Sequence, residues 1–183
     1  MKKMISVLLC LALLLSCAAA LAETAEKTEK TELKVSDTLT LRAAVPEGYE
    51  MVDLTADDQI LYMLESKDKT KPVLFLSLGV DDSWPAGTKL NNISDEDLKQ
   101  IENSKFLAYD PTVEISYTET AYGTKLLVAS QADKSAVIFY SLYEGYEVEF
   151  DLLNVDGSDL TQEQIDTCVK FLSDLDFVFT EKK

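Results

Sequence analysis

Apolar residues alternate with polar ones along most of this chain, and a period of two is typical of β-strands. Seven segments are predicted as strands on this basis: 38–44, 59–66, 72–81, 112–119, 124–131, 136–143 and 146–152. The apolar core of 72–81 and the whole of 136–143 are apolar on both faces, which indicates strands that are covered on both sides. Short polar turns join neighbouring strands, so their pairing is expected to be antiparallel.

Two helix starts interrupt this pattern, and each has the spacing of a capping box. Ser94 is followed by Asp97, and Thr161 by Gln164. After Thr161, one helix face collects the apolar residues Ile165, Cys168, Val169, Leu172 and Leu175. One helix midway and one at the end predict an α+β fold in a single domain over 35–183. In this fold two principal helices cover an antiparallel sheet of about seven strands.

The first 22 residues have the layout of a secretory signal peptide. Lysines follow Met1, a Leu-rich apolar run covers 4–16, and small residues stand at Ala20 and Ala22. The run is shorter than the ~20 residues that span a bilayer, so no membrane span is predicted. Cleavage after Ala22 would give a secreted protein that begins at Glu23.

A lipid anchor is the alternative, because residues 14–17 resemble the lipobox of bacterial lipoproteins. Cys17 would then be lipidated and would hold the chain on the outer face of the membrane. Both interpretations place the protein outside the cytoplasm, as a secreted or a cell-surface protein. Residues 23–34 have alternating charges and no apolar period, which predicts a disordered tether.

Acidic residues dominate the charge of the chain. Cleavage would remove two lysines from 17 basic residues, leaving 15 against 33 acidic residues and a net charge of −18. Such a chain repels nucleic acid and anionic membrane surfaces, so neither is expected as a partner. The acidity serves solubility alone, or it indicates a cationic partner or Ca²⁺.

Catalytic chemistry finds little support in the residue types present. The chain contains no histidine, which excludes Ser-His-Asp and Cys-His catalysis and His-bearing zinc sites. Cys168 is the one cysteine beyond the signal region and lies on an apolar helix face, so it is predicted to be buried and inert. No catalytic residue and no cofactor is predicted. A hydrolase that uses two carboxylates remains the alternative, with no pair singled out.

One segment partly resembles an EF-hand loop. Asn154, Asp156, Gly157 and Glu163 stand at the third, fifth, sixth and twelfth places of such a loop. Its first place is Leu152, which the strand pattern points inward. The segment is therefore predicted to be a polar strand-to-helix turn, and no metal site is predicted.

Aromatic residues supply the candidate binding surface. Trp84, Tyr49, Tyr143 and Tyr146 are the candidates to line a groove for an unknown protein or cell-envelope partner, since aromatic side chains give large rigid contacts. Tyrosines are also common in ordinary strands, so core packing is the favoured interpretation of the set. Trp84 is the strongest candidate, because it lies in a loop that Asp, Ser, Pro and Gly residues indicate.

The turn between the last two strands decides their register. A three-residue loop, with Gly145 alone in the left-handed region, pairs Tyr140 with Val148 and is the favoured prediction. A two-residue type I′ loop would place Glu144 at positive φ, which suits Asn or Gly better. The favoured register places Tyr140 in the core and removes it from the groove.

The order of elements, the turn Val45-Pro46-Glu47-Gly48-Tyr49 and the exported start resemble the Mog1/PsbP/DcrB-like fold group. The resemblance covers residues 38 to about 178. It implies a three-layer α/β/α sandwich and a non-catalytic binding or accessory role at the bacterial cell surface. Members of the group include photosystem accessory proteins, a transport-factor binder and bacterial lipoproteins. No functional residue is carried over.

Overall fold

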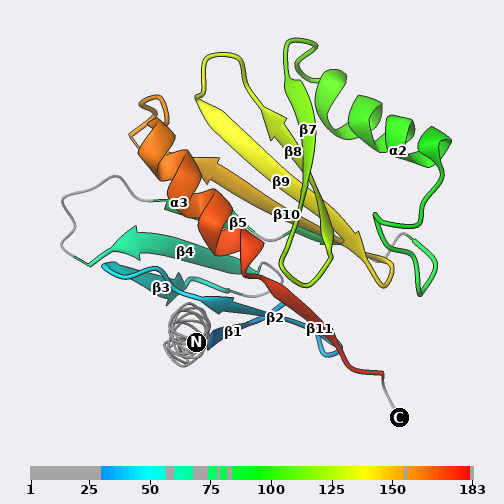
Figure 1. The fold of residues 1–183 in the computed structure, drawn as a ribbon, viewed down its shortest axis with the longest axis horizontal. Coiled ribbons are helices and arrows are strands. Elements are labelled where there is room, and N and C mark those ends of the chain that lie inside the picture. Colours follow the sequence, from blue (N-terminus) through cyan, green and yellow to red (C-terminus); the bar gives the residue numbers. More distant parts are fainter. Residues whose placement is uncertain are drawn as a thin grey trace, which may run out of the picture.

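The computed structural model describes residues 30–56, 60–67, 74–77, 79–81, 84–154 and 156–181. The predicted signal peptide and Cys17 lie outside these ranges. The described residues form a mixed α+β fold with three antiparallel sheets and two α-helices (Figure 1). Neither of these helices has the length and apolar character that a bilayer crossing requires.

Eleven strands make up the three sheets of this part of the chain. One sheet has the order β1 (Lys30–Lys34), β2 (Leu39–Ala44), β11 (Asp176–Phe179). The next has the order β3 (Tyr49–Asp53), β4 (Leu61–Ser66), β5 (Leu74–Ser77). The largest has the order β6 (Gly79–Asp81), β10 (Tyr146–Leu153), β9 (Ala136–Tyr143), β8 (Lys125–Ser130), β7 (Glu114–Glu119).

This architecture corrects two predictions. The expected single sheet of about seven strands is replaced by three separate sheets. The predicted tether was wrong for Lys30–Lys34, which forms β1 and pairs with β2, while 23–29 lie outside the described residues. Two features account for the difference: Leu33 is 1% exposed opposite Leu41, and five residue pairs join β1 to β2. The strand β3 was not predicted at all.

The five-stranded sheet is covered on both faces, as the apolar pattern of 136–143 predicted. On one face Val137 and Phe139 of β9 belong to the main core, which includes α3 (Gln162–Ser173) and the two smaller sheets. On the other face Tyr140 and Leu142 pack with the segment that contains α2 (Asp95–Ile101). Figure 1 shows α2 beside β7 and β8.

Both predicted helix starts are confirmed. Thr161 caps α3 through a complete capping box, in which its hydroxyl accepts from the Gln164 backbone and Gln164 accepts from the Thr161 backbone. Ser94 caps α2 by accepting from the Asp97 backbone at 3.1 Å. The helix then continues as a π-helical segment, Glu102–Leu107, which places Lys105 and Phe106 over the sheet.

The favoured register of the last hairpin was wrong. Tyr143 pairs with Tyr146 and Phe139 with Phe150, so the turn is the two-residue one. Glu144 has φ 52° and Gly145 has φ 88°. The Glu144 carboxylate lies 2.9 Å from the Lys89 ammonium, and this tertiary ion pair helps to hold Glu144 in a conformation that its local preference disfavours.

Tyr140 is 1% exposed, because both faces of β9 are covered. Its ring meets Phe106 edge-on, with the ring centroids 6.2 Å apart. The prediction that Tyr140 belongs to the core is therefore confirmed, although it packs on the opposite face from Val148.

Candidate functional site

A short loop, Trp84–Thr88, lies against the turn of the β9–β10 hairpin and is called the Trp84 loop below. The Gly145 N–H donates to the Thr88 carbonyl at 2.9 Å, and the Leu90 N–H donates to the Leu142 carbonyl at 2.8 Å. Gly145 also approaches the loop so closely that a Cβ atom there would lie 2.7 Å from the Trp84 carbonyl oxygen. These contacts fix the loop on the hairpin.

Three hollows border the Trp84 loop. The α2 hollow, of about 480 Å³, is lined by Trp84, Pro85, Ala86, Gly87, Thr88, Asn92, Ile93, Ser94 and Asp97. The β11 hollow, of about 590 Å³, is lined by Thr38, Ala86, Gly87, Glu144, Tyr146, Phe179 and Glu181. The Glu147 hollow, of about 280 Å³, is lined by Trp84, Gln100, Ile101, Ser104, Lys105 and Glu147. Each of the three hollows includes at least one residue of this loop, so together they make up the candidate surface.

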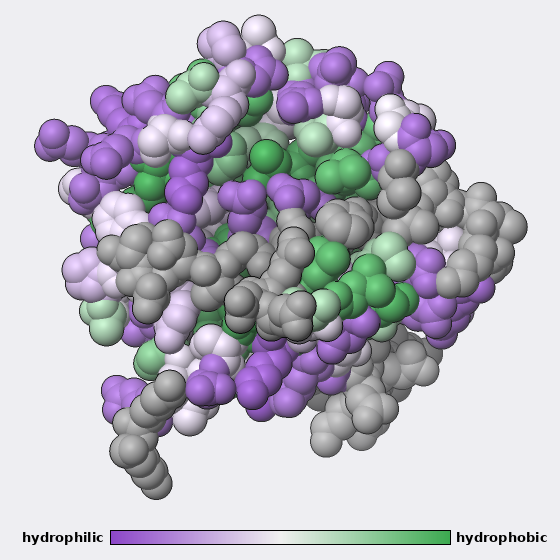
Figure 2. Space-filling view, turned by 180° about the vertical axis from the view of Figure 1, so that it is seen from behind, coloured by the Kyte–Doolittle hydropathy of each residue, from purple (hydrophilic) through white to green (hydrophobic). Residues whose placement is uncertain are grey.

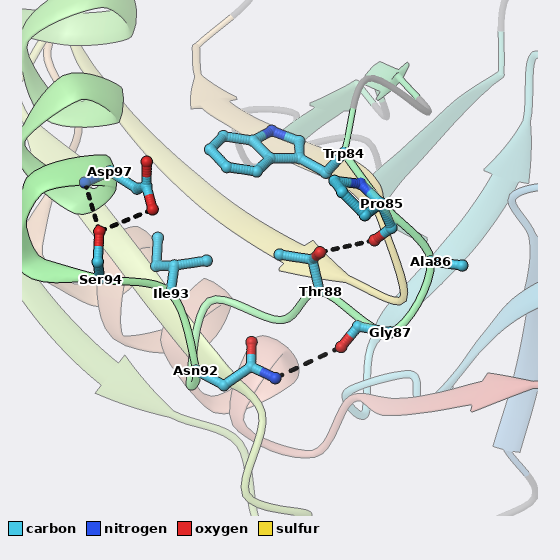
Figure 3. Close-up of a pocket in the computed structure, with 9 residues that line it drawn as sticks. All are labelled: Trp84, Pro85, Ala86, Gly87, Thr88, Asn92, Ile93, Ser94 and Asp97. Carbon is cyan, nitrogen blue, oxygen red and sulfur yellow. Dashed lines mark hydrogen bonds between the residues drawn. The ribbon is translucent and has the colours of Figure 1, made fainter.

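The Trp84 indole is oriented by a hydrogen bond from its N–H. Nε1 donates to Oε1 of Glu147 at 2.9 Å, and the other oxygen of Glu147 accepts from the Lys105 ammonium. Glu147 is 7% exposed, so little water reaches its carboxylate, and these two hydrogen-bond donors stabilise the negative charge. In Figure 3 the indole lies along one side of the α2 hollow, with Ile93 and Thr88 on another side.

Aromatic rings and carboxylates also meet in the β11 hollow. The rings of Tyr146 and Phe179 have centroids 6.5 Å apart, and the Tyr146 hydroxyl lies 2.9 Å from the Thr38 hydroxyl. Glu144 and Glu181 line the same hollow. Its lining therefore combines apolar rings with negative charge.

The predicted aromatic residues do not all share this surface. Trp84 and Tyr146 line its hollows. Tyr143 lies next to it in the hairpin, but its ring packs on Phe177 at 5.1 Å between centroids. Tyr49 belongs to β3 and packs against the main core, and it lines none of these three hollows.

The sequence did not indicate Phe179 or the carboxylates as residues that line the hollows. These carboxylates are Asp97, Glu144, Glu147 and Glu181. They come from α2, the hairpin turn, β10 and the segment around β11. These elements are far apart in the chain and share no spacing pattern. A signal was present only for Glu147, which alternates with the apolar residues of its strand.

Figure 2 shows the face behind that of Figure 1. Hydrophilic side chains occupy much of its rim, and apolar side chains gather in separate groups nearer the middle, with hydrophilic residues between them. Surfaces of this mixed kind favour partners that make polar as well as apolar contacts.

The segment that resembles an EF-hand loop forms a strand-to-helix turn. Leu152 is fully buried in β10, and the Asn154 side-chain oxygen accepts from Gln164 at 2.8 Å. Asp156 accepts from the Ser158 backbone and hydroxyl, and these bonds lower its pKa. Within the part of the chain that the structure describes, no group of three acidic or cysteine side chains is placed to hold a metal ion.

No family model, curated protein or solved structure matches this chain. The suspected membership of the Mog1/PsbP/DcrB-like fold group therefore has no support beyond the resemblance itself. Functional inference for this protein rests on its own residues and their geometry.

Cys168 is completely buried in the main core, as its place on the helix face predicted. Burial raises the pKa of its thiol, which disfavours the reactive thiolate. Desolvation and then the nearby Asp151 raise the pKa of the Glu149 carboxyl, while Lys105 opposes the shift. It lines none of the three hollows.

The change Glu149→Gln is expected to stabilise the protein at pH 7. A raised pKa in the folded state means that stability falls as pH rises from the unfolded value, ~4.3, through the folded value. The neutral glutamine carries no charge to desolvate, so the free energy of unfolding of the variant should exceed that of the parent protein at pH 7. The difference should vanish near pH 3, where Glu149 is protonated in both states. The gain should be less than ~1 kcal/mol, since the carboxyl is partly solvated. Urea unfolding of both proteins across this pH range measures it. A gain that does not change with pH would contradict the explanation.

Proposed function

We propose that this chain is an exported, non-catalytic binding protein that holds its partner on the surface around the Trp84 loop. The observation that carries the proposal is that three hollows border one loop, which presents the only tryptophan of the sequence. Tryptophan is enriched among residues that dominate binding energy. The role agrees with the absence of histidine from the sequence.

A surface that is already rigid loses little entropy on binding. The loop is anchored to the hairpin through Gly145, and Glu147 fixes the indole through its N–H. A partner would therefore meet side chains that are ordered before it arrives. This ordering of the loop and of the indole supports a binding role for the surface.

Export remains a proposal from residues 1–22. In the secreted form the mature chain would begin at Glu23, and in the lipid-anchored form it would begin at Cys17. The intact mass of the native protein distinguishes the two, since a diacylglyceryl group adds its own mass. Both forms place the binding surface outside the cytoplasm.

Site-specific crosslinking tests the binding surface. A photoreactive phenylalanine analogue at Ala86, an exposed residue that lines two hollows, should give a discrete adduct in the native cell envelope. The matched control is the same analogue at Val169, which is 38% exposed on α3. Adducts at Val169 and none at Ala86 would place the partner elsewhere and reject the proposed surface.

A further inference from the structure

We propose that the partner presents a cationic, extended peptide segment, with one basic side chain in the α2 hollow and another in the β11 hollow. This inference rests on the proposed function and names the chemistry of its ligand. Each of the two hollows combines an aromatic ring with a carboxylate. Ring faces attract cations, and a carboxylate beside the ring strengthens the attraction.

In the α2 hollow the ring is Trp84 and the carboxylate is Asp97. Oδ2 of Asp97 accepts from the Ser94 hydroxyl at 2.7 Å, and Oδ1 is not used in that bond. No described lysine or arginine forms an ion pair with Asp97. Figure 3 shows Asp97 and Ser94 at the helix end of the hollow and Trp84 on the loop side. A basic side chain that enters the hollow therefore meets both groups.

In the β11 hollow the rings are Tyr146 and Phe179, and the carboxylates are Glu144 and Glu181. Glu144 is already paired with Lys89. Glu181, by contrast, has no basic partner among the residues that the structure describes. Within the described residues, this second hollow therefore places one carboxylate without a basic partner beside two rings.

The protein holds two of its own lysines near this surface by the same chemistry. The Lys89 ammonium lies 4.4 Å from the Tyr143 ring centroid and 2.9 Å from the Glu144 carboxylate. The Lys105 ammonium lies 5.7 Å from the Tyr140 ring centroid and pairs with Glu147. Their positions show that a lysine fits between a ring and a carboxylate in this part of the fold.

The tip of the Trp84 loop separates the two hollows, because Ala86 and Gly87 line both of them. A Cβ atom on Gly87 would meet nothing within 4 Å, so the space over the tip is open. An extended segment that crosses this tip can direct basic side chains to either side. The excess of acidic residues in the chain adds a long-range attraction that salt weakens.

Fluorescence of Trp84, the only tryptophan, reports directly on the α2 hollow. Hexalysine and hexaarginine are titrated into the purified protein, with hexaglutamine and a neutral oligosaccharide in parallel. We expect a saturable change with the cationic peptides, weakened by added salt. The variant Asp97→Asn/Glu181→Gln should bind them roughly fivefold to tenfold more weakly, since each exposed charge pair makes a modest contribution to binding.

The matched control is Asp159→Asn/Glu163→Gln, which removes the same two charges at exposed positions near the start of α3. Its affinity should stay within about twofold of the parent protein, because screening confines the effect of distant exposed charges. Equal weakening in both double variants, or no saturable fluorescence change, would overturn the inference. A response to the oligosaccharide alone would also overturn it but would leave the proposed surface in place. Failure of the Ala86 crosslink, in contrast, rejects that surface itself.

Discussion

Replacing Gly145 by alanine is expected to destabilise the protein by about 2–4 kcal/mol. Gly145 has φ 88°, where an L-residue costs ~1–2 kcal/mol, and the new Cβ would lie 2.7 Å from the Trp84 carbonyl oxygen and 3.0 Å from that of Pro85. Relief of this clash requires the Trp84 loop to move, which adds ~1–2 kcal/mol of packing loss. Urea unfolding measures the change, and the Trp84 emission should shift because the indole loses its position.

Gly123→Ala is the matched control for this change. Gly123 has φ 77°, but a Cβ atom there would meet nothing within 4 Å. It should therefore cost only the conformational part, ~1–2 kcal/mol, and leave the Trp84 emission unchanged. If both variants lost the same stability and kept the same emission, the close approach of the Trp84 loop to the hairpin would be wrong.

Replacing Asn154 by alanine is expected to cost about 2–3 kcal/mol. Asn154 is 2% exposed, and its side-chain nitrogen donates to the Asp159 carbonyl at 3.0 Å and to the Ser158 carbonyl at 3.2 Å. Its oxygen accepts from Gln164, whose own oxygen caps the Thr161 N–H. Alanine would leave the buried Gln164 amide without this partner and remove the bonds to the two carbonyls, at ~1–3 kcal/mol for a group that water cannot reach. Chemical denaturation measures the loss.

Asn103→Ala serves as the control for Asn154, because Asn103 is exposed in the π-helical segment. It should change the free energy of unfolding by less than ~0.5 kcal/mol. A similar small change for Asn154→Ala would mean that water replaces its bonds and that the amide does not tie β10 to the start of α3.

Local sequence signals predicted the elements of this fold better than their assembly. The capping residues Ser94 and Thr161 locate both helix starts, because a cap acts within one turn. The predicted type of the β9–β10 turn was wrong, because the conformation of this turn depends on Lys89 and the Trp84 loop, which are distant in sequence. β9 is apolar on both faces, so neither register exposes an apolar row that would have signalled the error.

The candidate site was predictable in part. The composition around Trp84 indicated an exposed loop. Residues of this loop line all three hollows. Tyr49 was included on residue type alone, and the fold places it in another sheet. Glu181 and Asp97 could not have been paired with these rings from spacing, because only tertiary packing brings α2 and the end of β11 to the same loop.

The order in which the chain emerges during synthesis bears on when this surface can exist. β2 lies near the start of the described chain and β11 near its end, yet Leu41 is paired with Phe177. The sheet that contains both strands cannot close until β11 has left the ribosome. Phe179 belongs to β11 and Glu181 follows it, so the β11 hollow cannot form before this segment is available. A growing chain therefore cannot capture its ligand there, and binding competence begins only after synthesis has passed β11.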